Sequence, residues 1–292
     1  MAGIKLLVVG AGQMGSGIAQ VGAQAGYEVL LFDEFPGVKD RALGGIQRSI
    51  AKLVEKQQLS EKAEVVFERI RFTDQKKDLA PFAPDLMIEA ITENVEVKLA
   101  LYRELDALLP AKTILASNTS SIPITKIGAA TKRPEKVVGM HFMNPVPLMK
   151  LIEVIGGLAT SKESLDFALK VSQEMGKTTI VSKDMPAFVV NRVLMPMINE
   201  AFFALGEGLA SAEDIDTGVR LGLNHPMGPL TLADFVGLET CLAILEVLHK
   251  NLGEDKYRPA PLLRQYVEAG WYGKKSGRGV YKWDAATGQK VV

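Results

Sequence analysis

The sequence predicts an α/β protein, with a mostly parallel, helix-covered sheet over residues 1–184 and an all-helical domain over residues 185–292. Two observations carry this prediction. In the first part, short apolar runs alternate with helix-compatible stretches, which is typical of a parallel sheet covered on both faces. After Lys183-Asp184-Met185-Pro186 the strand signals end and helical periodicity dominates, which indicates a domain boundary near residue 184.

The first elements form two strand–helix units. Residues 4–9 are an apolar run closed by Gly10, and a helical stretch over 13–25 ends at Gly26. A second buried strand is expected at 28–32, before a helix with a polar face over 38–58. Further strands are expected at 86–90, 113–117 and 137–142, with edge strands at 151–155 and 178–181, further helices at 95–109, 189–209, 211–221, 230–251 and 261–269, and a loop at 270–279.

The charge balance narrows the classes of function. The 34 basic residues cancel the 34 acidic residues, which removes the overall attraction on which nucleic-acid and anionic-membrane binding usually depend. We therefore expect a small-molecule ligand, no nucleic acid and no membrane.

The rarer residues and the start of the chain add further expectations. The single cysteine, Cys241, excludes an intrachain disulfide and fits a small apolar helix residue. His225 and His249 have no cysteine or acidic partner at a metal-ligand spacing, so we expect no metal. No apolar run reaches the ~20 residues that span a bilayer, and the first strand signal begins at Ile4, so we expect no leader and a cytoplasmic location. The alternative is an organelle form already stripped of its leader, which has the same sequence features.

The turn after the first strand predicts a Rossmann-type dinucleotide site. Gly10-Ala11-Gly12-Gln13-Met14-Gly15 has the Gly-x-Gly-x-x-Gly spacing between a strand and a helix. Its glycines permit a tight turn, close approach of a pyrophosphate to the backbone and close helix–strand packing. Asp33 follows the second strand, where a carboxylate accepts hydrogen bonds from the adenosine ribose and repels a 2′-phosphate. We therefore expect NAD rather than NADP; the alternative is that Asp33 only begins a turn.

Several separated motifs identify the chain as similar to a known family. In order along the chain these motifs are Ser117-Asn118-Thr119-Ser120-Ser121, His141-Phe142-Met143-Asn144-Pro145, Glu153, Phe188-Val189-Val190-Asn191-Arg192 and Pro226-Met227-Gly228-Pro229. Together they resemble the 3-hydroxyacyl-CoA dehydrogenase family over essentially the whole chain, and the compact length is similar to the short bacterial 3-hydroxybutyryl-CoA dehydrogenases. The resemblance implies NAD-dependent interconversion of a short-chain 3-hydroxyacyl-CoA and its 3-ketoacyl-CoA.

One position departs from the family pattern. The family usually has Pro-Gly-Phe in the linker, whereas this chain has Pro186-Ala187-Phe188. Because alanine tolerates fewer backbone conformations than glycine, either the local torsions are ordinary or the geometry between the domains differs slightly.

The catalytic prediction centres on His141. Oxidation of a secondary alcohol needs a base for the hydroxyl proton, and histidine is the commonest group for that work. Glu153, twelve residues further along, can reach the other ring nitrogen from an adjacent strand and orient the ring. The plainer alternatives are a structural hydrogen-bonding histidine and a solvated glutamate. The resemblance implies that His141 is the base and Glu153 its partner, with Ser120 rather than Ser121 contacting the substrate oxygen and Asn191 approaching from the second domain.

The resemblance also implies further cofactor contacts. Glu93 and Lys98 match positions near the nicotinamide ribose, Asn118 and Asn144 border the nicotinamide, and a lysine of the basic tail, Lys275 or its neighbour, reaches the cofactor. The alternatives are a first-turn acid for Glu93 and a solvated helix face for Lys98.

The CoA part of the substrate calls for positive side chains outside the catalytic cleft. The helix that carries Ser49, Lys52 and Lys56 is the expected place, with Ser49 and Lys56 at a spacing similar to the family's CoA contacts. The alternative is an ordinary charged helix face.

Two further questions remain open in the sequence. The apolar segments 201–205 and 238–248 would be exposed in the second domain, which favours a homodimer formed through that domain, although an interior core also accommodates them. Two other functions are possible: an NAD enzyme for a non-CoA hydroxy acid, resembling a gulonate dehydrogenase, or a non-catalytic NAD-binding relative.

Overall fold

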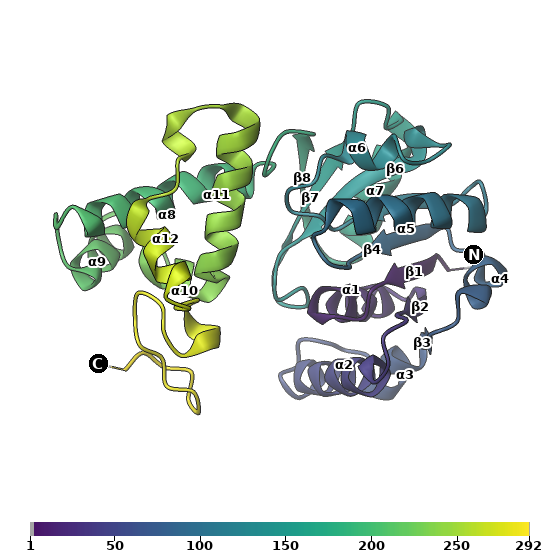
Figure 1. Cartoon of the computed structure of the whole chain (residues 1–292). Helices are drawn as coiled ribbons and strands as arrows, with labels where there is room; N and C mark the ends of the chain where they lie inside the picture. Colours follow the sequence, from purple (N-terminus) through teal and green to yellow (C-terminus); the bar gives the residue numbers. More distant parts are fainter. Residues whose placement is uncertain (1–2, 292) are drawn as a thin grey trace. The chain divides into compact units, whose positions relative to one another are not determined.

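The computed structural model describes residues 3–291, which form two compact units. The first unit ends at Met185 and the second begins at Pro186, next to the predicted boundary at residue 184. Figure 1 shows the sheet and helices of the first unit in purple to teal, and the all-helical second unit in green to yellow. The predicted fold class, an α/β unit followed by a helical one, is confirmed.

The N-terminal unit is built on an eight-stranded sheet with the order β3-β2-β1-β4-β5-β6-β7-β8. Its strands are β1 (Lys5–Val9), β2 (Glu28–Phe32), β3 (Ile70–Thr73), β4 (Leu86–Glu89), β5 (Ile114–Ser117), β6 (Val137–Phe142), β7 (Leu151–Gly156) and β8 (Thr178–Lys183). All neighbours are parallel except β6 and β7. The chain leaves β1 toward β2 on one side and returns to β4 on the other. Such a switch point opens a crevice at the carboxyl ends of the strands, where ligands of open α/β sheets bind.

The edges of this sheet differ from the sequence prediction. The strand expected at 151–155 is present as β7, but its expected edge position is wrong: β7 pairs antiparallel with β6 and parallel with β8 and so lies inside the sheet. The other expected edge strand, at 178–181, is confirmed as β8. The opposite edge, β3, was missed because Ile-Arg-Phe-Thr is short and only partly buried, and its signal is weak.

The helices of the N-terminal unit are α1 (Gln13–Gln24), α2 (Val38–Glu55), α3 (Ala63–Glu68), α4 (Leu79–Phe82), α5 (Val95–Leu108), α6 (Ile124–Gly128) and α7 (Lys162–Glu174), with the single 3-10 turns η1 (Lys76–Asp78) and η2 (Pro134–Lys136). Helix α1 packs on β1 and β2, and α2 packs on α1. The buried residues of α2 recur every four positions, at 38, 42, 46 and 50, which is the spacing of one helix face. Helix α7 was not predicted, because the small polar Ser164 and Ser172 share its buried face with Ala168 and Val171.

The C-terminal unit consists of α8 (Val190–Gly206), α9 (Ala212–Gly222), α10 (Pro229–Val236), α11 (Leu238–Leu252) and α12 (Pro261–Glu268), with the 3-10 turns η3 (Asp255–Tyr257) and η4 (Lys274–Ser276). The single helix predicted over 230–251 is wrong. Gly237 has φ +102° and separates α10 from α11, a conformation that glycine adopts without the penalty that a side chain would bring. An isolated glycine in an apolar stretch gave no sign of this break.

The core of the C-terminal unit takes up the apolar segments for which a partner was expected. Ala201 and Phe202 of α8 and Leu238, Cys241 and Leu245 of α11 are at most 6% exposed and pack in one cluster. The interior of the unit therefore accounts for these segments without a dimer. Cys241 is the small apolar helix residue predicted, and burial raises the pKa of its thiol to about 12, so the thiol stays protonated at neutral pH.

The linker alanine is not in an ordinary conformation. Ala187 has φ +64° and Phe188 has φ +51°, a region that costs a residue with a side chain roughly 1–2 kcal/mol. Glycine, the family's usual residue at position 187, adopts this region freely. Of the two alternatives raised by the sequence, ordinary torsions at Ala187 are thus excluded.

Candidate active site

Four neighbouring strands bring most of the predicted site residues to one edge of the sheet. Strands β1, β4, β5 and β6 lie side by side and run parallel. The glycine turn follows β1, Glu93 follows β4, and the segment 118–121 follows β5. His141 lies near the end of β6, and Asn144 follows that strand. Residues far apart in the sequence therefore converge at the carboxyl edge.

The glycine turn forms a cradle at the start of α1. A Cβ on Gly15 would lie 1.7 Å from the carbonyl oxygen of Gly10, so a side chain there cannot coexist with the tight turn. At Gly12, in contrast, a Cβ would meet no heavy atom within 4 Å and would fill the open side of the turn. Gly12 is the N-cap of α1, and no side chain caps the helix. Uncapped N–H groups and the positive end of the helix dipole suit a pyrophosphate, so the residues present fit NAD.

Asp33 is joined to the glycine turn. It follows β2, and its Oδ2 accepts a hydrogen bond of 2.7 Å from the backbone N–H of Ala11, while Oδ1 accepts one from Phe35 N–H. The turn that Asp33 begins is therefore real, and the same carboxylate also lies against the motif to which the sequence assigned it. The expected contact of Asp33 with an adenosine ribose stays a prediction.

His141 and Glu153 are direct partners across β6 and β7. Their register in the antiparallel pair places them opposite each other, and Nδ1 of His141 lies 2.7 Å from Oε2 of Glu153. Glu153 is fully buried and His141 is 6% exposed. The interpretation of Glu153 as a solvated charge is therefore wrong. The pair has the geometry of a histidine oriented by a carboxylate.

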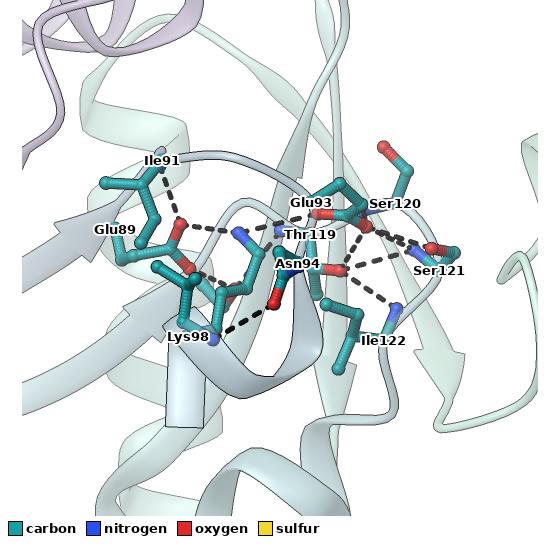
Figure 2. A network of polar contacts seen from close by, with 11 residues as sticks. Glu89, Ile91, Glu93, Asn94, Lys98, Thr119, Ser120, Ser121 and Ile122 are labelled. Atoms are coloured by element: carbon teal, nitrogen blue, oxygen red, sulfur yellow. Dashed lines mark hydrogen bonds and ion pairs between the residues drawn. The ribbon is translucent and has the colours of Figure 1, made fainter. Parts of the chain in front are cut away.

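Glu93 organises the segment that carries the two candidate serines. Its Oε1 accepts hydrogen bonds from the Thr119 hydroxyl at 2.6 Å, from the backbone N–H groups of Ser120 and Ser121, and from the Ser121 hydroxyl at 3.0 Å. Figure 2 shows the Ser121 hydroxyl directed at Glu93 and the Ser120 side chain directed away from it. Ser121 is thus committed to holding the turn, and Ser120 is the serine whose hydroxyl is available for a ligand.

The charge on Glu93 is stabilised by the same contacts. Burial acts to raise the pKa of its carboxyl, but Lys98 and the donors of Thr119, Ser121 and Ser120 outweigh burial, so the pKa lies below the ordinary value. Glu93 is therefore an anion at neutral pH. It lies in the turn before α5, where Asn94 is the N-cap residue, rather than within the first turn of the helix.

A buried ion pair lies beneath this segment. Lys98 of α5 is 1% exposed and its Nζ lies 2.5 Å from Oε1 of Glu89 and 3.4 Å from Oε2 of Glu93. Glu89, the last residue of β4, is fully buried and also accepts hydrogen bonds from the Ser117 hydroxyl and from Ile91 N–H (Figure 2). The solvated-face interpretation of Lys98 is wrong. Sequence reasoning missed Glu89, because a glutamate that ends an apolar strand does not reveal its buried partner.

The two asparagines take different positions. Asn118 Oδ1 accepts a hydrogen bond of 2.8 Å from Phe142 N–H, which ties the end of β5 to the end of β6 next to His141. Asn144 lines a hollow of about 430 Å³ together with Gly12 and Gln13 of the glycine turn. Ser49 of α2 also lines this hollow, whereas Lys56, the C-cap residue of α2, does not.

The remaining predicted residues belong to the C-terminal unit. Asn191 lies in the first turn of α8, and Lys275 lies in η4, where its ammonium group pairs with Glu239 of α11. The neighbouring Lys274 has its Nζ 4.6 Å from the centre of the Phe235 ring. The contacts expected of Asn191 and Lys275 with cofactor and substrate stay predictions.

The described part of the chain lacks two other features, a metal-binding cluster and a helix suited to cross a membrane. Residues 3–291 contain no group of three or more His, Cys, Asp and Glu side chains placed to hold a metal ion. Among the same residues, no helix combines the length and the apolar character that a membrane crossing needs.

Comparison with known proteins decides the family. The family model described as 3-hydroxyacyl-CoA dehydrogenase, NAD binding domain, matches residues 5–185, and the model of the C-terminal domain matches residues 188–283. The chain belongs to the 3-hydroxyacyl-CoA dehydrogenase family. The predicted class of enzyme, an oxidoreductase with NAD as its cofactor, is therefore confirmed.

Relatives of this dehydrogenase match it over almost its whole length. A probable 3-hydroxybutyryl-CoA dehydrogenase from Bacillus subtilis (strain 168) is 53% identical and covers 97% of this chain and 98% of the relative. A 3-hydroxybutyryl-CoA dehydrogenase from Bradyrhizobium diazoefficiens is 48% identical, with coverage of 97% and 96%. The crystal structure of (S)-3-hydroxybutyryl-CoA dehydrogenase PaaH1 from Ralstonia eutropha is 46% identical, with a TM-score of 0.92 and coverage of 96% and 99%.

Proposed function

We propose that this dehydrogenase interconverts 3-hydroxybutyryl-CoA and acetoacetyl-CoA, with His141 as the base and acid. The observation that carries the mechanism is the buried contact between His141 Nδ1 and Glu153 Oε2 at the carboxyl edge of the sheet. The choice of a four-carbon acyl group is supported by relatives of that name at 48% and 53% identity.

The reaction consists of a hydride transfer and a proton transfer. When bound, NAD supplies the acceptor for the hydride that leaves C3 of the substrate. As the C3 hydroxyl becomes a carbonyl, Nε2 of His141 takes its proton, and in reduction the same nitrogen returns it. Glu153 holds the ring by Nδ1 and stabilises the imidazolium that forms.

The serine segment positions the reacting oxygen. We assign the Ser120 hydroxyl to the substrate oxygen, because Ser121 is held by Glu93 while Ser120 is directed away from it. Asn191 is proposed as a contact from the C-terminal unit. Such donors strengthen as negative charge develops on the oxygen in the transition state.

The proposed NAD contacts begin with the glycine turn and continue along the carboxyl edge of the sheet. Gly10, Gly12, Gln13, Met14 and Gly15 are proposed to hold the pyrophosphate, and Asp33 the adenosine ribose. On the nicotinamide side we propose Glu93, Lys98, Ser120, Asn118, Asn144 and Lys275. The buried contact of Lys98 with Glu89 supports a role for Lys98 in fixing Glu93. Ser49 and Lys56 are proposed for CoA, and the position of Ser49 on the hollow supports its assignment.

We also propose a cytoplasmic location and a homodimer formed through the C-terminal unit.

The support for a dimer lies in exposed apolar side chains of the helices: Val193 on α8 is 71% exposed, and Leu221 and Leu223 at the end of α9 are 67% and 64% exposed. Single exposed residues are common, but several on neighbouring helices suit an interface. Sedimentation of the wild type against Leu221→Asp tests the dimer, which the variant should weaken; a wild-type monomer at micromolar concentration contradicts it.

The test of function is consumption of NADH with acetoacetyl-CoA, run beside free acetoacetate and beside NADPH. Turnover should require the thioester and NADH. His141→Ala should lower kcat by about 10²- to 10⁴-fold, the usual contribution of a general acid–base, while NADH binding is retained. A histidine outside the site, His249, gives a matched control, His249→Ala, with unchanged kcat. Absence of turnover with the thioester despite NADH binding rejects the substrate assignment.

A further inference from the structure

Asp234, near the end of α10, lies against both ends of the loop that carries Lys275. This loop, residues 273–279, surrounds η4 and begins and ends with a glycine. A Cβ on Gly273 would lie 2.3 Å from the carbonyl oxygen of Asp234, and a Cβ on Gly279 would lie 2.0 Å from Asp234 Oδ1. The two glycines therefore allow the loop to close directly onto Asp234, an approach that a side chain at either position would prevent.

The carboxylate of Asp234 fastens the chain just after this loop. Its Oδ1 accepts a hydrogen bond from Val280 N–H and its Oδ2 accepts one from Tyr281 N–H, both at 2.9 Å. Oδ2 also accepts from the indole N–H of Trp283 at 2.8 Å. Three donors on two oxygens suit a carboxylate, because an asparagine amide has a single oxygen and would turn its NH₂ group toward at least one of the donors.

The charge of Asp234 is kept at a cost to stability. Asp234 is 1% exposed, and burial outweighs the three hydrogen bonds, so that the pKa of its carboxyl lies above the ordinary value. A carboxyl with a raised pKa is less favourable as an anion in the folded protein than in water. Features that are kept at a cost to stability are expected where function needs them. The loop that Asp234 holds is the place to look for that function.

Lys275 is the residue of this loop for which a contact with the cofactor is proposed. It is exposed and lies in η4, and its ammonium group pairs with Glu239 in the first turn of α11. Asp234 thus fixes the backbone of the loop, while Glu239 fixes the end of the lysine side chain. A group that is held in place before its ligand arrives loses less conformational freedom on binding.

Resting on the proposed function, in which Lys275 contacts NAD, we propose that Asp234 is a positioning residue for the cofactor. By holding residues 273–279 in one conformation, Asp234 sets the place from which the Lys275 ammonium group meets the dinucleotide. Asp234 itself touches neither cofactor nor substrate. Its replacement should therefore weaken NADH binding only as far as Lys275 contributes to that binding.

The test is a double-mutant cycle on NADH binding, followed by the fluorescence of NADH without thioester. Lys275→Met should raise the Kd for NADH by about 10- to 100-fold, the worth of one hydrogen bond to a charged group. Asp234→Asn should raise it by about 3- to 10-fold, within the range of coupling between contacting groups. In the Lys275→Met background, Asp234→Asn should change the Kd by less than about twofold, because the lysine that it positions is gone. The KM for acetoacetyl-CoA should stay near the wild-type value.

Gly279→Ala displaces the loop without changing a charge, because its methyl group would collide with Asp234 Oδ1. It should raise the Kd for NADH as Asp234→Asn does, and the effect should again vanish in Lys275→Met. The matched control is Gly218→Ala in α9, where a Cβ would meet no heavy atom within 4 Å; NADH affinity should not change.

Asn199→Ala controls for a general loss of stability in the C-terminal unit. Asn199 is 3% exposed and fastens another loop, donating to Arg258 O and accepting from Ala260 N–H. Its replacement should lower the melting temperature and leave the Kd for NADH unchanged. If Asn199→Ala weakens NADH binding as much as Asp234→Asn does, the role of Asp234 is structural and the inference is overturned.

The remaining outcomes separate this inference from the proposed reaction. The inference is overturned if Lys275→Met binds NADH as the wild type does, or if the effect of Asp234→Asn persists in the Lys275→Met background. If Asp234→Asn does not fold, the cycle with Gly279→Ala decides in the same way. A wild type that binds NADH but does not reduce acetoacetyl-CoA rejects the substrate assignment, whereas the cycle, which uses NADH alone, still supports or overturns the role of Asp234.

Discussion

Two groups of charged side chains lie at the carboxyl edge of the sheet, each built around a buried contact, and they differ in what their charges can do. The first is His141 with Glu153, placed opposite each other on β6 and β7 with 2.7 Å between Nδ1 and Oε2. The second is Lys98 of α5 with Glu89 and Glu93, at 2.5 and 3.4 Å. Histidine is the side chain that gains and loses a proton near neutral pH, whereas a paired lysine and glutamate keep their charges there.

The difference teaches that burial of charge does not by itself mark a catalytic group. The His141 pair is suited to transfer a proton, and the Lys98 group is suited to fix the turn that carries Ser120. If this division is right, variants of the first group change kcat and variants of the second change stability. The following experiments compare the two groups, from the largest expected effect to the smallest.

Glu153→Gln should give the largest effect, on kcat. Glutamine has nearly the same size and keeps an oxygen that accepts from Nδ1, but it lacks the charge that stabilises the imidazolium. We expect kcat to fall by about 10²- to 10⁴-fold, the range of general acid–base contributions, with NADH affinity unchanged. The control is Glu174→Gln, the same change at a carboxylate that accepts from the Tyr27 hydroxyl, where kcat should not change. A loss of less than threefold at Glu153 removes the carboxylate from the mechanism.

Lys98→Met should give the largest loss of stability. It leaves Glu89 buried and without its cation, and breaking a buried pair by removing one partner costs about 3–5 kcal/mol. Denaturation in urea measures the change. Adding Glu89→Gln should restore most of the loss, because the amide carries no charge and still accepts hydrogen bonds.

The exposed pair of Lys162 and Asp166 gives the matched control for Lys98. Its side chains are 85% and 54% exposed, and Lys162→Met should change stability by no more than about 0.5 kcal/mol. If Lys98→Met is equally mild, the buried cluster does not hold the fold, and Lys98 belongs with the cofactor contacts alone.

Ser120→Ala and Ser121→Ala repeat the comparison within two adjacent residues. Loss of the Ser120 hydroxyl should lower kcat by about 10- to 100-fold, the worth of one hydrogen bond to a charged group, with little change in stability. Loss of the Ser121 hydroxyl, which donates to Glu93 at 3.0 Å, should lower stability by about 0.5–1.5 kcal/mol and leave kcat within about threefold. Ser120→Thr should restore activity in part. If Ser121→Ala lowers kcat and Ser120→Ala lowers stability instead, then Ser121 contacts the substrate and Ser120 holds the turn.

The sequence predicted the first group far better than the second. His141 and Glu153 were found because the motifs around them are specific and because two adjacent strands can bring residues twelve positions apart together; the antiparallel register that pairs them was seen only in the structure. Glu89 was missed, and Lys98 had a solvated helix face as its alternative. Their contact depends on how α5 packs against the end of β4, and no local pattern records that packing.

The fold shows the same division between local and non-local information. Strands with long apolar runs, such as β1 and β6, were predicted within a residue of their bounds. The half-buried β3 and the internal position of β7 depend on pairing between distant segments. The break at Gly237 depends on a backbone conformation, φ +102°, that an apolar helical pattern conceals.

The pH dependence of the Glu93 contacts gives the smallest effect and the finest test. Because the folded state lowers the pKa of Glu93, its contribution to stability is full above the ordinary value of 4.5 and is lost as pH falls through the lowered folded value. The difference in unfolding free energy between wild type and Glu93→Gln should therefore be constant near neutral pH and shrink in acid. Glu163→Gln, an exposed acid in the first turn of α7, controls for general acid effects. If the difference stays constant down to strongly acidic pH, the charge of Glu93 does not stabilise the turn. The turn is then held by the shape of the side chain alone.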